Sequence, residues 1–215
     1  MPFHLENIDK VAADFSHLNE SVRNQALYNI LNLSAHEIVK DVDELILSPG
    51  YRLVRVDSRL NLNRTHFELA LLCDITDEVV YYNKVIVTND VELNCRPVSQ
   101  VLIWRTRKPQ HKSALTDLAS KIFFHYLIKS YDVVASDINQ TTEGMSFWQA
   151  RMYEALHYGL YVYGYDVMSA DMIQISNEND VGNYQSWLWG SSEHYMNRLA
   201  IISKIRLPNQ RNDFT

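Results

Sequence analysis

Apolar residues in the central part of the chain, Val98–Tyr165, follow two different periods. Val98–Thr106 and Asp132–Ser136 are short runs of apolar and β-branched residues, and such runs predict buried strands. Between them, apolar residues recur at intervals of three and four, which predicts a long helix with one buried face. They are Leu115, Leu118, Ala119, Ile122, Phe123, Tyr126 and Leu127.

A second helix and a third strand are predicted after these two strands and the helix between them. Met152 and Leu156 share one face of a predicted helix over Gly144–Tyr158, and Gly159 predicts its end. Leu160–Tyr165 alternates between side-chain types, as a strand does. A strand–helix–strand–helix–strand series predicts a sheet whose faces are covered by helices.

The first 48 residues carry helical patterns only. An apolar stripe runs through Asn19–Leu33 and predicts one amphipathic helix. Ser34 and Glu37 have the spacing of a capping box, in which each side chain bonds a backbone amide near the other residue. They predict a second helix, which the breakers Ser48–Gly50 would end.

Residues 51–88 change to a period of two. Three strands are predicted, over Tyr51–Leu60, His66–Ile75 and Glu78–Thr88. The short polar connections between them favour antiparallel hairpins. A β-bulge at Asn83–Lys84 is an alternative to continuous pairing.

After the central region, Asp166–Asn183 is polar and irregular and predicts a loop. Tyr184–Trp189 is an aromatic cluster, either a lid over the core or an exposed partner surface. Leu199–Ile205 predicts a final strand that completes the sheet.

Together these patterns predict an α+β fold, with a mixed, mostly antiparallel central sheet flanked by helices. The chain has 215 residues, of which 47% are hydrophobic, and this length suffices for one sizeable core. We expect residues 1–48 to form a helical segment packed on a single core made by residues 49–215.

Composition excludes several classes of protein. The net charge is −6, so bulk attraction to nucleic acid or to anionic membranes is not expected. No apolar run approaches the ~20 residues that span a bilayer, and the N-terminus has no signal-peptide pattern. Cys73 and Cys95 lack metal-binding spacing, and we expect free thiols in a reducing cytoplasm. No metal site is predicted.

The segment between Leu93 and Thr116 reverses the charge of the chain, because it contains no acidic residue. Its basic residues are Arg96, Arg105, Arg107, Lys108 and Lys112. The segment leads into the predicted helix start, where unpaired amides and the helix dipole favour anions. It is either a cradle for a phosphate group or a solvated basic turn.

The order of elements resembles the GNAT family of N-acetyltransferases over roughly Tyr51 to Arg206. Members carry Arg/Gln-x-x-Gly-x-Gly/Ala at the loop that binds the pyrophosphate of acetyl-CoA. Here Arg107 matches this motif, whereas Gln110 and Lys112 stand where the glycines would be. The resemblance implies acetyl-CoA as cofactor, held by the loop residues Arg105, Arg107, Lys108, Gln110, His111, Lys112 and Ser113.

The second half of the chain extends the resemblance. Asp132–Asp137 corresponds to the family's strand that splays from its neighbour, and Gly144–Gly159 to the helix that carries a catalytic tyrosine in many members. The resemblance implies Tyr153 as the acid that protonates the leaving thiolate, with Asp137 or Glu68 as the base. Without the resemblance, Asp137 reads as a turn cap and Tyr153 as a packed amphipathic side chain.

The run from Ser136 to Trp148 (S-D-x-x-Q-T-x-x-G-x-x-x-W) is similar to one in divergent acetyltransferase-like proteins encoded by tailed bacteriophages. Two main functions follow as expectations, with a third beside them. One is an acyl-CoA-dependent N-acetyltransferase that acts on an amine. The other is a catalytically inactive binding protein of GNAT fold that targets a host protein, and a nucleotide-binding protein is a third.

Overall fold

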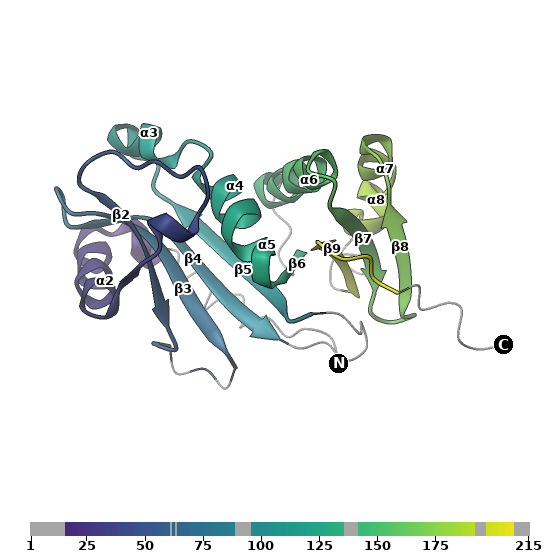
Figure 1. Cartoon of the computed structure of the whole chain (residues 1–215), viewed down its shortest axis with the longest axis horizontal. Coiled ribbons are helices and arrows are strands. Elements are labelled where there is room, and N and C mark those ends of the chain that lie inside the picture. The colour runs from purple at the N-terminus through teal and green to yellow at the C-terminus, as the bar shows by residue number, and fades with distance from the viewer. Residues whose placement is uncertain are drawn as a thin grey trace. The chain divides into compact units, whose positions relative to one another are not determined.

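The computed structural model describes residues 16–60, 62, 64–88, 96–135, 142–191 and 197–208 (Figure 1). The fold is α+β, and the chain divides into two compact units. The first unit comprises the described residues of Asp9–Thr88 and Val101–Leu127, and the second unit comprises those of Asn89–Gln100 and Ile128–Thr215.

The first unit is built on antiparallel strands in the order β1–β2–β3–β4–β5 (Figure 1). The strands span His36–Glu37, Tyr51–Asp57, His66–Cys73, Glu78–Thr88 and Val98–Arg105. The hairpins predicted for β2, β3 and β4 are confirmed, because both pairings are antiparallel. Every residue of β3 is buried, so both faces of this strand are covered by other elements.

The β3–β4 ladder contains one register shift. Leu71 pairs with Tyr81 and Leu72 with Val79, so Val80 is the extra residue of a β-bulge. The alternative of a bulge at Asn83–Lys84 is therefore wrong, and the continuous pairing expected there is confirmed.

Helix α2 (Ser21–Ser34) covers one face of the first unit's sheet (Figure 1). It follows the helical residues Ser16–Asn19 and packs against strands β2–β4 and Trp104. The shared core is made of buried apolar side chains. They are Leu18, Tyr28, Leu31, Val54, Val56, Ala70, Leu72, Val79, Tyr82 and Trp104.

The second helix predicted after Ser34 is wrong. Ser34 ends α2, and His36–Glu37 is strand β1, paired with β2. A short 3₁₀ helix, η1 (Val39–Asp41), follows. The backbone N–H of Ile38 donates to Leu53 O at 3.0 Å, and Ile38 is 1% exposed. Burial of this side chain beside β2 outweighs a local capping preference.

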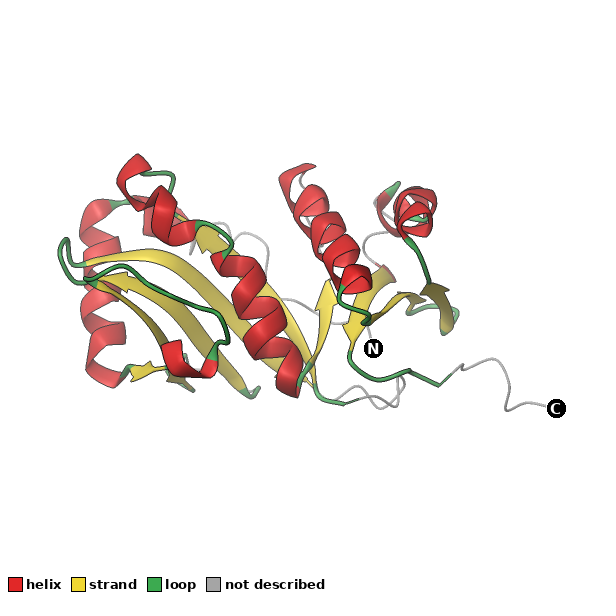
Figure 2. Cartoon of the chain, turned by 45° about the horizontal axis from the view of Figure 1, so that its top comes forward, coloured by secondary structure: helices red, strands yellow, loops and turns green. Residues whose placement is uncertain are grey.

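The opposite face of this sheet carries helices that follow β5 (Figure 2). They are η2 (Pro109–His111), α3 (Lys112–Leu115), α4 (Leu118–Ile122) and the π-helical turn η3 (Phe123–Leu127), and α5 (Ile128–Ser130) continues into the second unit. The prediction of one uninterrupted helix from Leu115 is wrong, because Asp117 adopts a left-handed φ of 56°. Most of the predicted apolar face is nevertheless buried from Leu118 onward, with Ala119 and Tyr126 half-buried.

The second unit contains β6 (Asp132–Ala135), α6 (Thr142–His157), β7 (Tyr161–Asp166), β8 (Asp171–Ile175) and β9 (Arg198–Ser203). The strands follow the order β6–β9–β7–β8, and each of these neighbouring pairs is antiparallel. The chain's last strand therefore lies between two earlier ones. The first residues of β5, which belong to this unit, pair in parallel with β6.

Most elements predicted for this unit are confirmed, namely β6, α6, β7 and β9. The loop predicted over Asp166–Asn183 is wrong: it contains β8 and α7 (Glu178–Asn183), and α8 (Gln185–Trp189) follows. Strand β8 was missed because the apolar alternation of Met172–Ile175 is short and is flanked by polar residues. None of the described helices is long and apolar enough to cross a membrane.

Candidate functional site

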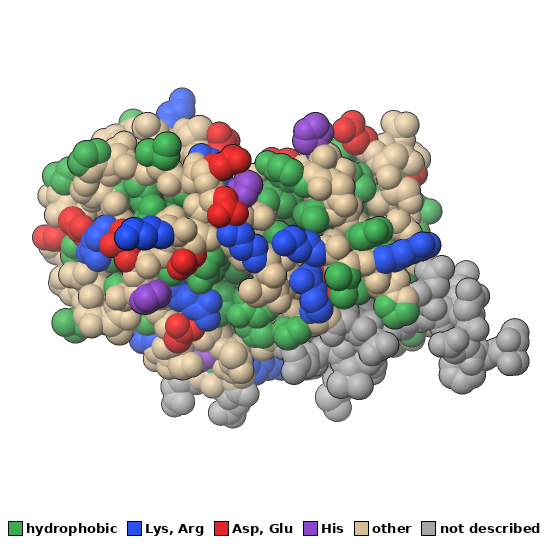
Figure 3. All heavy atoms as spheres, viewed as in Figure 1, with side chains coloured by type: hydrophobic (Ala, Val, Ile, Leu, Met, Phe, Trp, Pro, Cys, Tyr) green, Lys and Arg blue, Asp and Glu red, His purple; other side chains and the backbone are tan. Residues whose placement is uncertain are grey.

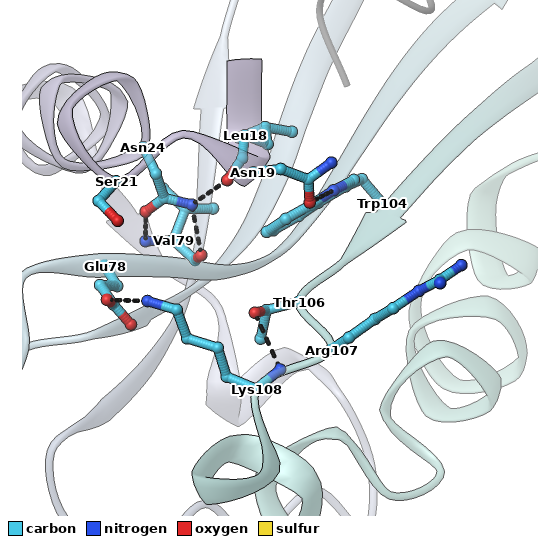
Figure 4. Close-up of a pocket in the computed structure, with 10 residues that line it drawn as sticks. All are labelled: Leu18, Asn19, Ser21, Asn24, Glu78, Val79, Trp104, Thr106, Arg107 and Lys108. Atoms are coloured by element: carbon cyan, nitrogen blue, oxygen red, sulfur yellow. Dashed lines mark hydrogen bonds and ion pairs between the residues drawn. The ribbon is translucent and has the colours of Figure 1, made fainter. Parts of the chain in front are cut away.

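The predicted basic loop borders a pocket of about 260 Å³ in the first unit (Figure 4). The pocket lies among the residues that lead into α2, the start of β4, and the end of β5 with the loop that follows. Its lining residues are Leu18, Asn19, Ser21, Asn24, Glu78, Val79, Trp104, Thr106, Arg107 and Lys108. Arg107 and Lys108 are therefore the predicted loop residues that border it.

The pocket wall is held by Asn24, a buried polar residue of α2. Its Nδ2 atom donates to Leu18 O and Val79 O, both at 3.0 Å. Its Oδ1 atom accepts from Val79 N at 2.8 Å. All three hydrogen-bond partners of the Asn24 side chain are backbone groups of Leu18 and Val79. Asn24 therefore joins α2 to β4 without the help of a second side chain.

An aromatic ring forms another part of the wall. Trp104, at the end of β5, is 9% exposed, and its Nε1 atom donates to Asn19 Oδ1 at 3.3 Å (Figure 4). Burial of a tryptophan with its N–H bonded is the usual arrangement for this side chain. The pocket thus combines an indole ring with hydroxyl and basic groups.

Glu78 binds two of the predicted loop residues. Its carboxylate forms an ion pair with Lys108, and its Oε2 atom lies 3.1 Å from His111 Nε2. His111 is 1% exposed, and its Nδ1 atom lies 2.9 Å from Tyr51 Oη. A proton on Nε2 fits the contact with Glu78, because a carboxylate only accepts, and Nδ1 shares the second hydrogen bond with the Tyr51 hydroxyl.

These contacts shift the pKa values of the groups around the ring. Burial raises the pKa of Glu78, but the hydrogen bonds and charges of Lys108 and His111 outweigh it, so the net pKa is lowered. Burial, together with Cys73 and Glu78 nearby, raises the pKa of Tyr51. Glu78 is thus a carboxylate, and it fixes the loop to β2 and β4.

The other predicted loop residues are exposed. They are Arg105, Arg107, Gln110, Lys112 and Ser113. Within the described part of the chain, no side-chain hydrogen bond or ion pair engages them. Figure 4 shows Arg107 directed away from Lys108, whereas Lys108 points to Glu78. Three cations of the loop are therefore available for an external anion.

The helix start beside the loop differs from the prediction. Helix α3 has only 4 residues, and α4 begins after Asp117, whose side chain makes no capping bond. A short turn has little dipole, and an acidic residue at the next helix start opposes anion binding. Positive charge at this place therefore comes from the side chains of the loop.

Basic side chains do not form a continuous patch over the first unit in the view of Figure 3, where they alternate with acidic ones. Arg52 with Asp74 and Arg55 with Asp57 are examples of such pairs.

Glu68, one predicted base, is fully buried in β3. Its Oε1 and Oε2 atoms accept from Arg59 at 2.6 and 2.7 Å, and Oε1 also accepts from Tyr82 at 2.5 Å. The side chain of Glu68 is 0% exposed, that of Arg59 is 24% exposed, and the ion pair raises the pKa of Arg59. Glu68 thus has a structural role, and proton uptake from a substrate would have to displace Arg59 or Tyr82.

The two other predicted catalytic residues belong to the second unit. Asp137 lies outside the described residues. Tyr153 lies on α6 and is 37% exposed. Its phenol is thus not packed into the core, which leaves its predicted role as an acid open.

The aromatic cluster of the second unit acts mainly as a lid. Leu188 and Trp189 are buried, and a Cβ added to Gly164 of β7 would meet Trp187 at 2.7 Å. The guanidinium of Arg198 lies 4.4 Å from the Trp187 ring centre. The structure therefore favours the lid over an exposed partner surface.

Tyr51, Glu78, Asn24 and Trp104 were not among the sequence-predicted site residues. Tyr51 and His111 are 60 positions apart, and Glu78 and His111 are 33 apart, so no local spacing joins them. A signal existed only for Glu78, an acidic residue at the start of β4 that is followed directly by two valines and two tyrosines.

Among the residues that the structure describes, no group of three potential ligands is arranged to hold a metal ion. Comparison with known proteins gave no match to a protein-family model, to a curated protein or to a solved structure.

Proposed function

We propose that this protein is a GNAT-like, acyl-CoA-dependent N-acetyltransferase that transfers an acetyl group to an amine, encoded by a bacteriophage. The observation that carries the proposal is the connection from β5 to β6. Val98–Gln100 pair in parallel with Asp132–Val134, and the basic loop and helices α3–α5 form the crossover. Ligands of such sheets bind beyond the carboxyl ends of the strands, and the basic loop follows that end of β5.

The parallel ladder between Val98–Gln100 and Asp132–Val134 supports the resemblance stated from the sequence. Antiparallel strands β2–β4 are followed by a strand, a basic loop, helices, a strand, a helix and a strand, in the family's order. The parallel ladder between β5 and β6 covers only three residue pairs of an eight-residue strand. A short ladder of this kind suits a strand that separates from its neighbour.

The loop supplies the chemistry that the pyrophosphate and the 3′-phosphate of the cofactor need. Arg105, Arg107 and Lys112 are exposed and have no described partner. Guanidinium groups bind phosphate oxygens in pairs, whereas an ammonium group binds as a point charge. Lys108 and His111 act differently: they hold the loop in place through Glu78.

The transfer needs one base and one acid. The amine nitrogen attacks the thioester carbonyl, the new C–N bond forms, and the C–S bond breaks as the tetrahedral intermediate collapses. Asp137 takes the proton from the amine, and Tyr153 gives a proton to the leaving thiolate. Glu68 contributes to stability through Arg59 and is not assigned a catalytic part.

The test is binding of acetyl-CoA followed by transfer. Ligand at about 100 times its Kd raises the unfolding free energy by about 2.7 kcal/mol, which thermal denaturation detects. Arg107→Ala should weaken binding by about tenfold or more, because a charge-assisted contact is lost. Lys40→Ala removes an exposed cation far from the loop in sequence and should leave binding unchanged. Absence of any shift at millimolar acetyl-CoA contradicts the proposal.

Transfer itself is read by mass spectrometry of an amine acceptor, such as a polyamine or a lysine peptide. Asp137→Asn and Tyr153→Phe should each lower the rate by 10²- to 10⁴-fold while binding of the cofactor persists. If both variants retain full activity, the assigned acid and base are wrong even though the fold assignment stands.

A second candidate is a binding protein of the same fold without catalysis, directed at a host protein. The specific observation is that Lys108 and His111 are already engaged by Glu78, while Gln110 and Lys112 replace glycines that would let amides approach a pyrophosphate. This candidate predicts no binding of acetyl-CoA, together with a specific complex in a bacterial lysate that mass spectrometry identifies.

A further inference from the structure

The pocket between the start of α2 and the end of β5 has an apolar floor. Leu18, Val79 and Trp104 line it, and all three side chains are buried. The Nε1 atom of Trp104 already donates to Asn19, so the indole offers a ligand its ring rather than its N–H group. A floor of this kind favours a ligand with a flat apolar body.

Asn24 fixes the shape of the pocket without offering a donor to a ligand. Both hydrogens of its amide nitrogen are used, one on Leu18 O and one on Val79 O. Its Oδ1 atom accepts from Val79 N. The wall is therefore formed before any ligand arrives, which lowers the entropy cost of binding.

The volume of the pocket limits the size of its occupant. The pocket measures about 260 Å³. An apolar cavity of ~150 Å³ holds one benzene ring, so this pocket has room for about ten heavy atoms, the size of two fused rings. Acetyl-CoA is several times larger than that. The occupant is thus a smaller molecule than the cofactor proposed above.

Charge indicates that the occupant is an anion with one negative charge. Of the ionisable residues that line the pocket, Glu78 and Lys108 neutralise each other in an ion pair. Arg107 has no hydrogen bond or ion pair within the described part of the chain, and Figure 4 shows it directed away from Lys108. A guanidinium group matches the two oxygens of a carboxylate. A phosphate monoester carries up to two charges, and the second would be repelled by Glu78.

Two hydroxyl groups complete the lining. Ser21 is exposed at the start of α2, and Figure 4 shows it across the pocket from Trp104. The Oγ1 atom of Thr106 accepts from Lys108 N at 3.3 Å, which leaves its hydrogen for a ligand oxygen. A few polar groups around an apolar floor are the usual composition of a small-molecule site.

We propose that this pocket binds a small aromatic carboxylate of one or two fused rings, with its ring against Trp104 and its carboxylate on Arg107. The inference is independent of the proposed acetyl transfer, because the floor and the volume of the pocket take no part in that reaction. Arg107 is the one residue that both proposals use.

The experiment is isothermal titration calorimetry of the full chain with 2-naphthoate, in the absence of acetyl-CoA. We expect one site with a Kd between about 10 µM and 1 mM, as suits a ligand of this size. Naphthalene-2-methanol keeps the ring without the charge, and acetate keeps the charge without the ring. Each should bind at least about tenfold more weakly than 2-naphthoate.

Two variants test the two ends of the pocket. Arg107→Gln should weaken binding of 2-naphthoate by about tenfold, because a charge-assisted contact is lost. Arg105→Gln is its control: Arg105 is an exposed cation of the same loop that does not line the pocket, and the variant should change the Kd by less than about twofold.

Ser21→Phe should fill the pocket and abolish saturable binding. Its control is Gln25→Phe, at an exposed position of the same helix outside the lining, which should leave the Kd unchanged. Both positions are exposed, so both variants should keep the thermal stability of wild type.

Three results overturn the proposal: no saturable binding of 2-naphthoate at several millimolar, equal affinity for naphthalene-2-methanol, or an affinity that neither Arg107→Gln nor Ser21→Phe changes. Since acetyl-CoA is absent from these titrations, each of them leaves the proposed acetyl transfer standing. Failure of the protein to bind acetyl-CoA likewise leaves this pocket assignment standing.

Discussion

The Nε2 atom of His111 lies 3.1 Å from the Oε2 atom of Glu78, and the imidazole is 1% exposed. Lys108 reaches the same carboxylate, and Tyr51 occupies the other ring nitrogen. One acidic residue, Glu78, therefore anchors the basic loop. The anchor divides the loop's basic residues into two that Glu78 holds, Lys108 and His111, and three without a described partner, Arg105, Arg107 and Lys112.

Removal of the anchor should loosen the loop. In Glu78→Ala the buried His111 loses its acceptor, and an unsatisfied buried donor costs about 1–3 kcal/mol of unfolding free energy. Chemical denaturation measures the loss. Glu37→Ala, an exposed glutamate on β1, is the control and should change stability by less than about 0.5 kcal/mol. Equal stability of wild type and Glu78→Ala would contradict the anchor.

The same carboxylate should make stability fall in acid. The pKa of Glu78 is lowered in the folded protein, so its contribution is present above the unfolded value of about 4.3 and is lost as the pH falls through the folded value. The pKa of Asp74 is lowered too, by its hydrogen bond from Arg52 against the effect of burial. Denaturation between neutral pH and pH ~3 should show this decline, and Glu78→Ala should flatten it.

Glu68 should prove structural in a direct test. Glu68→Gln leaves the Arg59 charge without its partner, and loss of one member of a buried ion pair costs about 3 kcal/mol or more. Glu20→Gln, at an exposed surface pair with Arg23, is the control and should cost less than about 1 kcal/mol. A Glu68→Gln protein of wild-type stability that fails only in acetyl transfer would restore Glu68 as the base.

Asn24 should be among the most sensitive positions of α2. Asn24→Leu removes three hydrogen bonds and leaves backbone groups of Leu18 and Val79 unsatisfied, so we expect a loss of about 2–4 kcal/mol. Asn29→Leu changes an exposed asparagine on the same helix and should be nearly neutral. The comparison of the two midpoints in urea checks the prediction.

Two glycines of the second unit should respond in opposite directions. Gly164→Ala places a Cβ 2.7 Å from the Trp187 ring and should cost about 1–3 kcal/mol through displacement of the lid. Gly182→Ala lies within α7 with open space at its Cβ, and it should stabilise by up to about 1 kcal/mol. Thermal unfolding of both variants provides the comparison, and equal effects would contradict the packing of Trp187 on β7.

The periodic spacing of apolar residues was enough to predict several strands and one helix. Period-two alternation located β2, β3 and β4, and helical spacing located α6. These patterns suffice because burial on one side of an element leaves a periodic trace in its own residues. The helix predicted from the capping box at Ser34 does not form. The segment after Ser34 is stabilised more by burial of Ile38 beside β2 than it would be by a second helix.

For the candidate site, the sequence determined which chemical groups are present, namely the loop cations and the absence of acids among them. Only the tertiary structure decided which of these cations are neutralised. Glu78 approaches Lys108 and His111 because β4 and η2 meet in the folded first unit. A contact between segments 33 positions apart depends on strand register and packing, neither of which leaves a periodic trace in the residues that make it.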